Sequence, residues 1–337
     1  MINSGTIKVA LIGAGGMGTK WAHALKHSSN VSLVCISDQD KPRAEVLAKE
    51  IKDCRAELDW REVVKSADVD AVVIVTPHKF LTEIAIEALK NNKHVLSEKP
   101  GGVSSVEIAQ AIKMAEKTGA KYMIGFNHRY HPAFLMAKEL VDKGEIGQIL
   151  FVRARYGFGG RPGYANEWRF NKEMSGGGEL LDQGSHMIDL SRQFLGEFPE
   201  VTGFTPTLFW KNGVEDNGFA LLKTQDGRVA SIHVSWTQWK WVHSFEIMGS
   251  DGYLTIEGLD NRYVGPERLI IGKRDPEFRN PPTEQVVVFD KETSETSLER
   301  LIAEFVSAIK ENREPAVSGK DAYEMLKIVE KIYAQNK

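Results

Sequence analysis

Cysteine is almost absent from the 337-residue chain, which holds only Cys35 and Cys54. Two cysteines without a C-x-x-C pair or a histidine-rich tract provide neither a disulfide framework nor a structural zinc site, so we expect no bound metal. So few cysteines are typical of a protein of the reducing cytoplasm, and that is the location we expect.

Long apolar runs and an excess of charge of one sign are missing too. No apolar segment approaches the roughly 20 residues that span a bilayer. The short apolar run near the N-terminus leads into a glycine motif and not into the cleavage site of a signal peptide. A formal net charge of -3 gives no attraction to nucleic acid or to an anionic membrane. We therefore expect a small-molecule partner and, from the length, two domains.

A glycine-rich turn stands between an expected strand, residues 7–12, and an expected helix, residues 19–26. Its G-x-G-x-x-G spacing in this context predicts a dinucleotide pyrophosphate site at a helix N-terminus. The first glycine allows the tight turn, the second the close approach of the pyrophosphate, and the third the packing of the helix. A tight turn without a ligand is the alternative. The residues expected to bind the cofactor here are Gly13, Gly15, Gly16, Met17 and Gly18.

An acidic residue, Asp38, follows the second expected strand, residues 31–36, about 20 residues beyond the last glycine. Its carboxylate would accept hydrogen bonds from a ribose 2′-hydroxyl and repel a 2′-phosphate. Residues 39–42 offer no arginine to bind such a phosphate. NAD is therefore preferred over NADP as the cofactor. Alternatively, Asp38 only caps the helix that starts near Pro42.

The pattern of the chain changes near residue 126. Before it, continuous Val/Ile strands alternate with amphipathic stretches, as in a parallel sheet covered by helices on both faces. After it, polar and apolar residues alternate, and turns at Asp226-Gly227 and Asp251-Gly252 indicate antiparallel hairpins. Two amphipathic helices close the chain. These patterns predict an α/β fold with a dinucleotide-binding domain over residues 1–126 and a second domain over residues 127–337.

Lys99 follows the strand that includes residues 94–96, at the carboxyl edge of the expected parallel sheet, where ligands bind in this architecture. A lysine there could stabilise the charge that develops on a substrate oxygen during hydride transfer. A solvated lysine in a loop is the alternative.

Spacings of four and three residues place Asp182, His186 and Asp189 on one face of an expected helix. Histidine is the side chain best suited to exchange a proton near neutral pH. An aspartate one turn away can orient it and favour its protonated form. A histidine bonded inside a core is the main alternative. A metal site is disfavoured, because no further His or Cys cluster completes a ligand set.

Aromatic and basic residues gather before the triple glycine and after the strand that ends at Trp236. Such groups suit a sugar, a sugar phosphate or a sugar nucleotide, but an aromatic-rich stretch serves equally as core or subunit interface. The residues are Arg153, Arg155, Arg161, Trp168, Arg169, Trp236, Trp239, Lys240, Trp241 and His243. Of these, Arg155, Trp168 and Arg169 are candidate substrate contacts.

Five segments in this order resemble the Gfo/Idh/MocA family of oxidoreductases, over nearly the whole chain. They are the glycine loop, Thr76-Pro77, residues 93–100 with Glu98-Lys99-Pro100, Gly125-Phe126-Asn127, and residues 182–189. The resemblance implies an N-terminal Rossmann domain with a doubly wound parallel sheet. It also implies a C-terminal α+β domain with an open, mainly antiparallel sheet, and substrate in the cleft between the domains. Homo-oligomers, dimers or tetramers, built through that sheet are implied too.

The resemblance also assigns residues. Lys99, Asp182 and His186 fall on the catalytic positions, with His186 as the base or acid toward a secondary hydroxyl. His128 lies where relatives often touch substrate. Leu81 stands where many relatives carry a histidine, and His78 lies nearer the Thr-Pro pair instead. Further cofactor contacts are expected from Thr76, Pro77, His78, Glu98, Lys99 and Asn127, the last beside the nicotinamide.

The expected function is an NAD-dependent dehydrogenase acting on a secondary alcohol or ketone of a sugar, cyclitol or sugar nucleotide. The same resemblance covers two alternatives: glycoside hydrolases that retain NAD, and non-catalytic regulators that keep the fold as a sensor. The presence of Lys99, Asp182 and His186 argues against a regulator, because a sensor needs no proton-transfer residues.

Overall fold

The computed structural model describes residues 5–260, 263, 265–290 and 294–336. The chain divides into two compact units. The first comprises residues 1–127 and 295–324, and the second comprises residues 128–294 and 325–337. The segment 295–324 therefore belongs with the N-terminal unit. Because the chain returns to this unit after the second one, a single boundary near residue 126 does not separate the two units.

The first unit is built on a six-stranded parallel sheet with the order β3-β2-β1-β4-β5-β6. Its strands are β1 (Ile7–Ile12), β2 (Val31–Ser37), β3 (Arg55–Glu57), β4 (Ala71–Ile74), β5 (His94–Glu98) and β6 (Tyr122–Gly125). The helices between them are α1 (Gly16–His27), α2 (Lys41–Ala48), α3 (Trp60–Lys65), α4 (His78–Lys90) and α5 (Ser105–Thr118). All residues of β4 and β6 are buried, as the continuous apolar pattern predicted.

Polar side chains and glycine set the ends of these helices. Ser104 Oγ accepts a hydrogen bond from Glu107 N at 3.3 Å and begins α5, and Gly119, with φ of +74°, ends it. Two helices complete the chain: α10 (Ser294–Lys310), and α11 (Gly319–Gln335), which runs from the first unit into the second.

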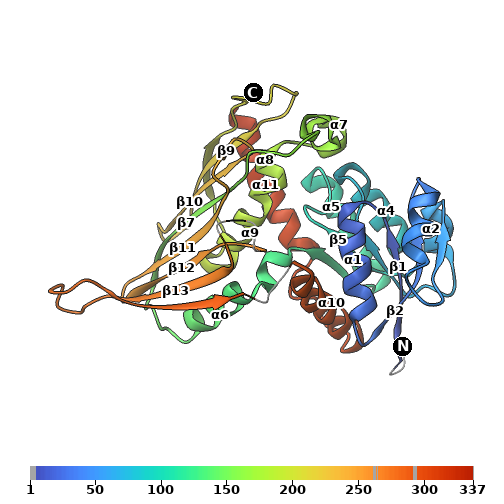
Figure 1. Cartoon of the computed structure of the whole chain (residues 1–337), viewed down its shortest axis with the longest axis horizontal. Coiled ribbons are helices and arrows are strands. Elements are labelled where there is room, and N and C mark those ends of the chain that lie inside the picture. Colours follow the sequence, from blue (N-terminus) through green and yellow to red (C-terminus); the bar gives the residue numbers. More distant parts are fainter. Residues whose placement is uncertain (1–4, 261–262, 264, 291–293, 337) are drawn as a thin grey trace. The chain divides into compact units, whose positions relative to one another are not determined.

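The second unit is built on an eight-stranded sheet with the order β14-β13-β12-β11-β7-β10-β9-β8. Only the β7 and β10 pair is parallel among its neighbours in the described residues. The strands are β7 (Ile149–Gly157), β8 (Glu200–Phe204), β9 (Asn217–Lys223), β10 (Val229–Ser235), β11 (Val242–Gly249), β12 (Gly252–Glu257), β13 (Glu267–Lys273) and β14 (Thr283–Phe289). The two predicted hairpins, β9–β10 and β11–β12, are confirmed. The hairpin loop between β13 and β14, in orange, extends away from this sheet (Figure 1).

Helices cover one face of the eight-stranded sheet. The 3-10 turn η1 (Asn127–Tyr130) leads into α6 (Pro132–Asp142), and α8 (Glu179–Asp182) and α9 (Gly184–Leu195) pack on β7, β9 and β10 (Figure 1). Between them lie η2 (Tyr164–Asn166), η3 (Trp168–Phe170) and α7 (Lys172–Ser175). Ala230, Ile232 and Val234 of β10 are buried beneath the helices, whereas Ser231 and His233 face outward and are partly exposed. The predicted fold class, a Rossmann unit followed by a mainly antiparallel α+β unit, is confirmed.

The triple glycine before α8 allows backbone and side chains to come close. A Cβ at Gly178 would lie 1.9 Å from Glu215 O, and one at Gly177 would lie 2.1 Å from Tyr333 Oη. Glu215 Oε1 accepts a hydrogen bond from that Tyr333 hydroxyl at 2.6 Å. Side chains larger than hydrogen would therefore displace α8, which carries Asp182.

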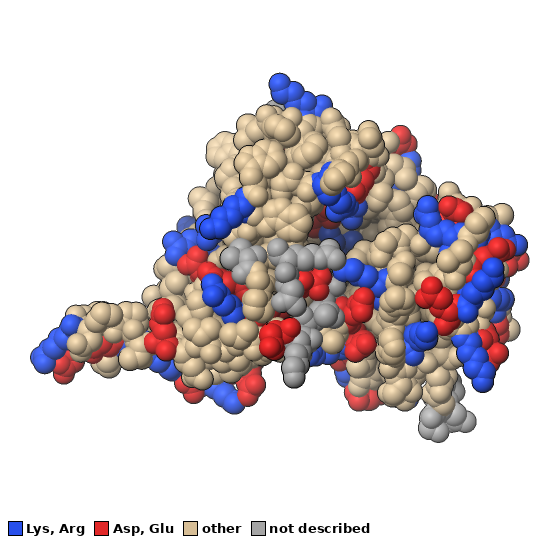
Figure 2. Space-filling view, in the orientation of Figure 1, with Lys and Arg blue, Asp and Glu red and all other residues tan. Residues whose placement is uncertain are grey.

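No helix among the described residues is long and apolar enough to cross a membrane. On the face drawn in Figure 2, Lys and Arg side chains alternate with Asp and Glu, and neither sign forms an extended patch. This mixed surface agrees with the formal net charge of -3.

Candidate functional site

The glycine loop joins β1 to α1 in the first unit. Gly13 has φ of +109°, and a Cβ there would lie 2.5 Å from Val75 O on the neighbouring chain segment. A Cβ at Gly18 would lie 2.1 Å from Gly13 O. By contrast, a Cβ at Gly15 or Gly16 would meet nothing within 4 Å. Gly13 and Gly18 are thus required by the fold itself, whereas Gly15 and Gly16 leave open space over the N-terminus of α1, where a pyrophosphate fits.

Asp38 lies directly after β2, and its carboxylate is held against the glycine loop. Oδ2 accepts a hydrogen bond from Ala14 N at 2.7 Å, and Oδ1 accepts one from Asp40 N at 2.9 Å. The alternative role as cap of the next helix belongs to Asp40 instead, because Asp40 Oδ1 accepts from Arg43 N at 3.3 Å at the start of α2. Asp38 is therefore positioned beside the loop, as an adenosine ribose contact requires.

The Thr76-Pro77-His78 segment links β4 to α4. The side-chain oxygen of Thr76 is buried and has no hydrogen-bond partner within the described residues. Such an orphaned hydroxyl next to the glycine loop suits a polar ligand, because a buried polar atom without a partner is costly. His78 is the first residue of α4 and is buried, and Leu81 is fully buried in the core.

Glu98 and Lys99 lie where β5 ends. Glu98 Oε1 accepts a hydrogen bond from Trp21 Nε1 at 2.7 Å, and Oε2 accepts one from Lys99 N at 3.1 Å. The glutamate therefore fixes the backbone of Lys99 against α1. The Lys99 side chain is partly exposed at this sheet edge. Asn127, at the end of the first unit, donates from Nδ2 to Ser297 Oγ of α10 at 3.0 Å.

In the second unit, Asp182 and His186 lie on two helices and not on one. The expected continuous helix is interrupted: α8 ends at Asp182, Gln183 follows, and α9 begins at Gly184. Asp182 is buried, and its Oδ2 accepts a hydrogen bond from Arg169 Nε at 3.0 Å. Burial opposes the charge of Arg169, but Asp182, Tyr164 and Glu167 together outweigh this effect and raise the pKa of the guanidinium. Arg169 also lies over the Trp168 ring, 4.7 Å from its centre.

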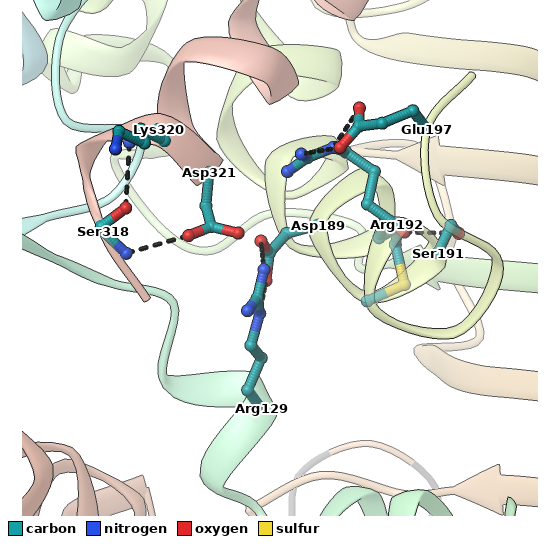
Figure 3. A network of polar contacts seen from close by, with 9 residues as sticks. Arg129, Asp189, Ser191, Arg192, Glu197, Ser318, Lys320 and Asp321 are labelled. Atoms are coloured by element: carbon teal, nitrogen blue, oxygen red, sulfur yellow. Dashed lines mark hydrogen bonds and ion pairs between the residues drawn. The ribbon is translucent and has the colours of Figure 1, made fainter. Parts of the chain in front are cut away.

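Asp189 has a structural partner that the sequence pattern did not reveal. Arg129, on η1, donates from Nε and Nη2 to the two carboxylate oxygens of Asp189 at 2.7 and 2.5 Å. Figure 3 shows the two side chains facing each other; Arg192, further along α9, pairs with Glu197, which follows the helix. Both groups of the Arg129 and Asp189 pair are nearly buried, with exposed fractions of 11% and 1%. This bidentate pair ties η1 to α9.

His186 belongs to a buried group of four histidines, named here the histidine cluster: His128, His131, His186 and His243. The His128 and His186 rings are stacked, with centroids 3.7 Å apart and planes inclined by 10°. His131 and His243 meet His128 edge to face at 5.5 and 5.6 Å. His131 Nδ1 in turn lies 2.7 Å from Glu267 Oε2, and Glu267 Oε1 accepts from Ala133 N at 2.8 Å.

Arg155 is not brought to this cluster. Along β7 the side chains alternate, so Tyr156 faces the helices and contacts His128, whereas Arg155 is exposed on the opposite face of the sheet. Among the aromatic residues, Trp236 is fully buried, but Trp239 and Trp241 are 61% and 37% exposed. Within the described residues, no group of three His, Cys, Asp or Glu could hold a metal ion.

Comparisons with known proteins identify the class to which these features belong. Residues 7–126 match the model described as oxidoreductase family, NAD-binding Rossmann fold, and residues 134–255 match the GFO/IDH/MocA C-terminal domain. The chain belongs to the Gfo/Idh/MocA family of NAD-binding oxidoreductases. The Rossmann unit carrying the glycine loop and the sheet unit carrying the histidine cluster correspond to the two matched regions.

Among curated relatives, the scyllo-inositol 2-dehydrogenase (NAD(+)) of Bacillus subtilis strain 168 is 30% identical over 77% of this chain and 76% of its own length. The levoglucosan dehydrogenase of Pseudarthrobacter phenanthrenivorans is also 30% identical, over 66% of this chain. This alignment spans 59% of that relative's length. A solved levoglucosan dehydrogenase in complex with NADH and levoglucosan superposes with a TM-score of 0.87 at 25% identity, covering 98% of this chain and 96% of that one.

The cofactor is NAD, as the family and the first unit agree. The residues present fit this group: open space at Gly15 and Gly16, the orphaned Thr76 hydroxyl, and the Asp38 carboxylate beside the loop. Sequence reasoning found the loop and Asp38 from spacing, but not the bond between them. It also missed Arg169 as the partner of Asp182 and His128 as the partner of His186.

Proposed function

We propose that this protein is an NAD-dependent dehydrogenase that acts on a secondary alcohol or ketone of a sugar, a cyclitol or a sugar nucleotide. Bound NAD supplies the hydride acceptor or donor. In this proposal the glycine loop and Asp38 bind and orient the dinucleotide. Lys99, Asp182 and His186 act on the substrate hydroxyl, by stabilising the charge on its oxygen, orienting the reacting groups and transferring its proton.

The observation that carries this proposal is the assembled dinucleotide loop, in which Asp38 is fixed to Ala14 beside two glycines that leave open space. A carboxylate there binds ribose hydroxyls and opposes a 2′-phosphate, which favours NAD over NADP. We assign further cofactor contacts to Pro77, at the start of α4, and Met17, in the first turn of α1. With Gly16, His78, Glu98, Lys99 and Asn127 they complete the proposed cofactor contacts.

For the chemical step, His186 takes the hydroxyl proton during alcohol oxidation and returns it during ketone reduction. Lys99 holds a positive charge close to the developing alkoxide, which stabilises it. Asp182, held by Arg169, orients the reacting groups on the substrate side. Alcohol oxidation removes a hydride and a proton from the substrate, and ketone reduction adds both, so the direction of proton transfer at His186 follows the direction of hydride transfer.

The substrate class follows from the relatives and from the half-buried groups near Asp182. The relatives named above carry levoglucosan and scyllo-inositol in their names, and both are polyhydroxylated rings. Trp168 and Arg169 offer an aromatic face and a cation, a combination suited to the apolar face and the hydroxyls of such a ring. We also propose that His128 contacts the substrate, because its ring stacks on that of His186.

A screen of purified protein with NAD and with NADP against cyclitols, anhydrosugars, aldoses and sugar nucleotides tests this function. The expected result is net NADH formation with at least one polyhydroxylated ring. NADH formation is decisive because a hydrolase that retains NAD produces none, and a regulator shows binding without turnover. Product formation without net NADH would contradict the dehydrogenase function and indicate a hydrolase that retains NAD.

We also propose a homo-oligomer, a dimer or tetramer, in which a second copy covers the outer face of the eight-stranded sheet. That face carries Phe204, Phe219 and Leu221, whose exposed fractions are 69%, 39% and 51%. Registered pairing places Phe204 opposite Phe219, so these apolar groups are contiguous. Light scattering during size exclusion tests this state, and Leu221→Lys is expected to shift it toward the monomer.

Cytoplasmic location is the last part of the proposal. Cys35 and Cys54 are both free thiols, which suits a reducing compartment. Fractionation of the source cells with an antibody against the protein tests this location.

A further inference from the structure

The stacked pair in the histidine cluster joins two separate elements of the second unit. His128 comes from η1 and His186 from α9, and the bidentate Arg129 and Asp189 pair ties the same two elements together one residue and three residues away. The Arg129 and Asp189 pair therefore keeps the two elements that carry the stacked rings together. The exposed fractions of the two histidines are only 5% and 6%. The ring of His186 lies nearly parallel to that of His128, with the planes inclined by 10°.

Two imidazole rings at a centroid distance of 3.7 Å cannot easily both carry a proton. Each proton adds a positive charge, and two charges at this distance in a buried environment repel each other strongly. Such groups titrate as a pair: the first proton is shared between the two sites, and the second binds only at a much lower pH.

Three of the neighbouring rings add no charge at neutral pH. Burial, followed by the effect of His131, lowers the pKa of His243 to about 3. Burial raises the pKa of Tyr156 well above its ordinary value, and it raises that of Tyr263, which packs on Tyr156, to about 12. These three side chains are neutral where a histidine base works.

The charged groups around the stack are mostly paired. Asp189 binds Arg129, Asp182 binds Arg169, and Glu267 binds His131. Glu179, buried on α8, is a further acid whose charge acts on Tyr156. Such surroundings can support one proton on the stack, but they offer little compensation for a second.

We propose that His128 is a positioning residue for His186, whose ring it holds in place, and that the stack limits the two histidines to a single proton between them. The inference rests on the proposed role of His186 as the acid and base of the reaction. When the pair holds one proton, a share of the molecules carries it on His128 and keeps His186 neutral. Alcohol oxidation then continues to a lower pH than an isolated histidine would allow.

The direct test is an NMR titration of the full-length protein labelled in its histidine rings, with the His186 and His128 signals assigned by their loss in His186→Asn and His128→Phe. In the wild type, both signals are expected to move together in two separate steps. In His128→Phe, which keeps an aromatic ring, His186 is expected to titrate in one step. A single independent step for His186 in the wild type would overturn the inference, whether or not the variant folds.

The pH profile of kcat/KM for alcohol oxidation gives the second readout. In His128→Phe the acidic limb is expected to move up by about one pH unit, because no neighbour remains to take the shared proton. His243→Phe is the matched control: it changes a ring that also packs on His128, but one that is neutral, and the limb should not move. An equal shift in both variants would assign the effect to packing alone and overturn the inference.

Failure of the proposed function is distinguishable from failure of this inference. If His186 is not the acid and base, the two-step NMR titration persists, but His186→Asn leaves the pH profile unchanged. If the stack does not couple the two protons, His186→Asn still abolishes the acidic limb while the NMR titration shows single steps.

Discussion

The main-chain N–H of Ala14 donates a hydrogen bond to Oδ2 of Asp38 at 2.7 Å, across 24 positions of sequence. It joins the glycine loop to the end of β2, so the segments proposed to bind the pyrophosphate and the ribose are fixed together. A change at Asp38 is therefore expected to affect both cofactor choice and the loop itself.

Replacing Asp38 by Ser together with Gln39→Arg is expected to move the preference from NAD toward NADP. The double variant removes the carboxylate that repels a 2′-phosphate and adds a cation that binds it. NAD affinity should fall by tenfold or more, about 1.4 kcal/mol, because the bond to Ala14 is also lost. Titration calorimetry with both cofactors measures this. Asp40→Ser, which alters the cap of α2 and its exposed ion pair with Arg43, is the control. Tighter binding of NADP than NAD by the wild type would contradict the assignment.

Two glycines of the same loop are expected to respond in opposite ways to alanine. A Cβ at Gly15 meets nothing within 4 Å and the residue has φ of -72°, so Gly15→Ala should fold normally yet lose NAD affinity, because the methyl group occupies the space of the pyrophosphate. A Cβ at Gly18 would lie 2.1 Å from Gly13 O, so Gly18→Ala should lower the free energy of unfolding by roughly 2 kcal/mol. Thermal melts with and without NAD separate the two effects. Equal stability losses in the two variants would show that Gly15 also serves the fold.

Lys99→Ala is expected to reduce kcat by on the order of a hundredfold or more, while the Kd for NAD changes only a few fold. The physical reason is that the ammonium group is needed chiefly as charge develops on the substrate oxygen. Steady-state kinetics and calorimetry on the same preparation measure both values. The exposed Lys90→Ala is the matched control. Near-normal turnover in Lys99→Ala would show that Lys99 is a solvated loop residue without a catalytic role.

Alcohol oxidation is expected to rise with pH and ketone reduction to fall, because His186 must be neutral to accept a proton and protonated to donate one. His186→Asn should abolish this ionisation and slow both directions. Asp182→Asn should lower the apparent pKa, because it removes a negative charge next to the histidine, while Arg169 keeps its positive charge and its ion pair with Glu167. Profiles of both reactions at saturating cofactor, with substrate isotope effects, are the measurement. A profile that survives in His186→Asn would mean that another group carries the proton.

Stability of the first unit is expected to decrease in acid through His94. Its Nδ1 accepts a hydrogen bond from Lys121 N at 3.0 Å, and burial, then the charge of Lys121, lowers its pKa from 6.5 to about 4. As the pH falls from 6.5 to 4, the unfolded chain gains a proton that the folded protein does not. The free energy of unfolding therefore falls, by up to about 3 kcal/mol.

Urea unfolding at pH 7.5, 6 and 5 measures this loss. His94→Gln is expected to flatten the dependence on pH, although the variant is less stable at pH 7.5. The exposed His27→Gln is the matched control and should keep the wild-type slope. A slope for His94→Gln equal to that of the wild type would show that other groups cause the acid loss.

The sequence by itself determined the elements with a strong local signal. Glycine spacing and an acid after the second strand predicted the dinucleotide loop, because tight turns and close backbone approach tolerate few other residues. Continuous apolar strands predicted the buried parallel sheet, and alternating strands with Asp-Gly turns predicted the antiparallel hairpins. β13 and β14 were not predicted, because the apolar residues of each strand come in a run and do not alternate with polar ones, and a proline-rich loop separates the strands.

Only the tertiary structure decided the partners of the functional side chains. Helical spacing grouped Asp182, His186 and Asp189, but the helix is interrupted at Gln183. Each of these three side chains contacts a residue from another element, in order Arg169, His128 and Arg129. Arg155 lies one residue from Tyr156 and yet on the opposite face of the sheet. Local periodicity fixes the face on which a side chain lies, whereas the group it meets depends on packing between elements distant in the sequence.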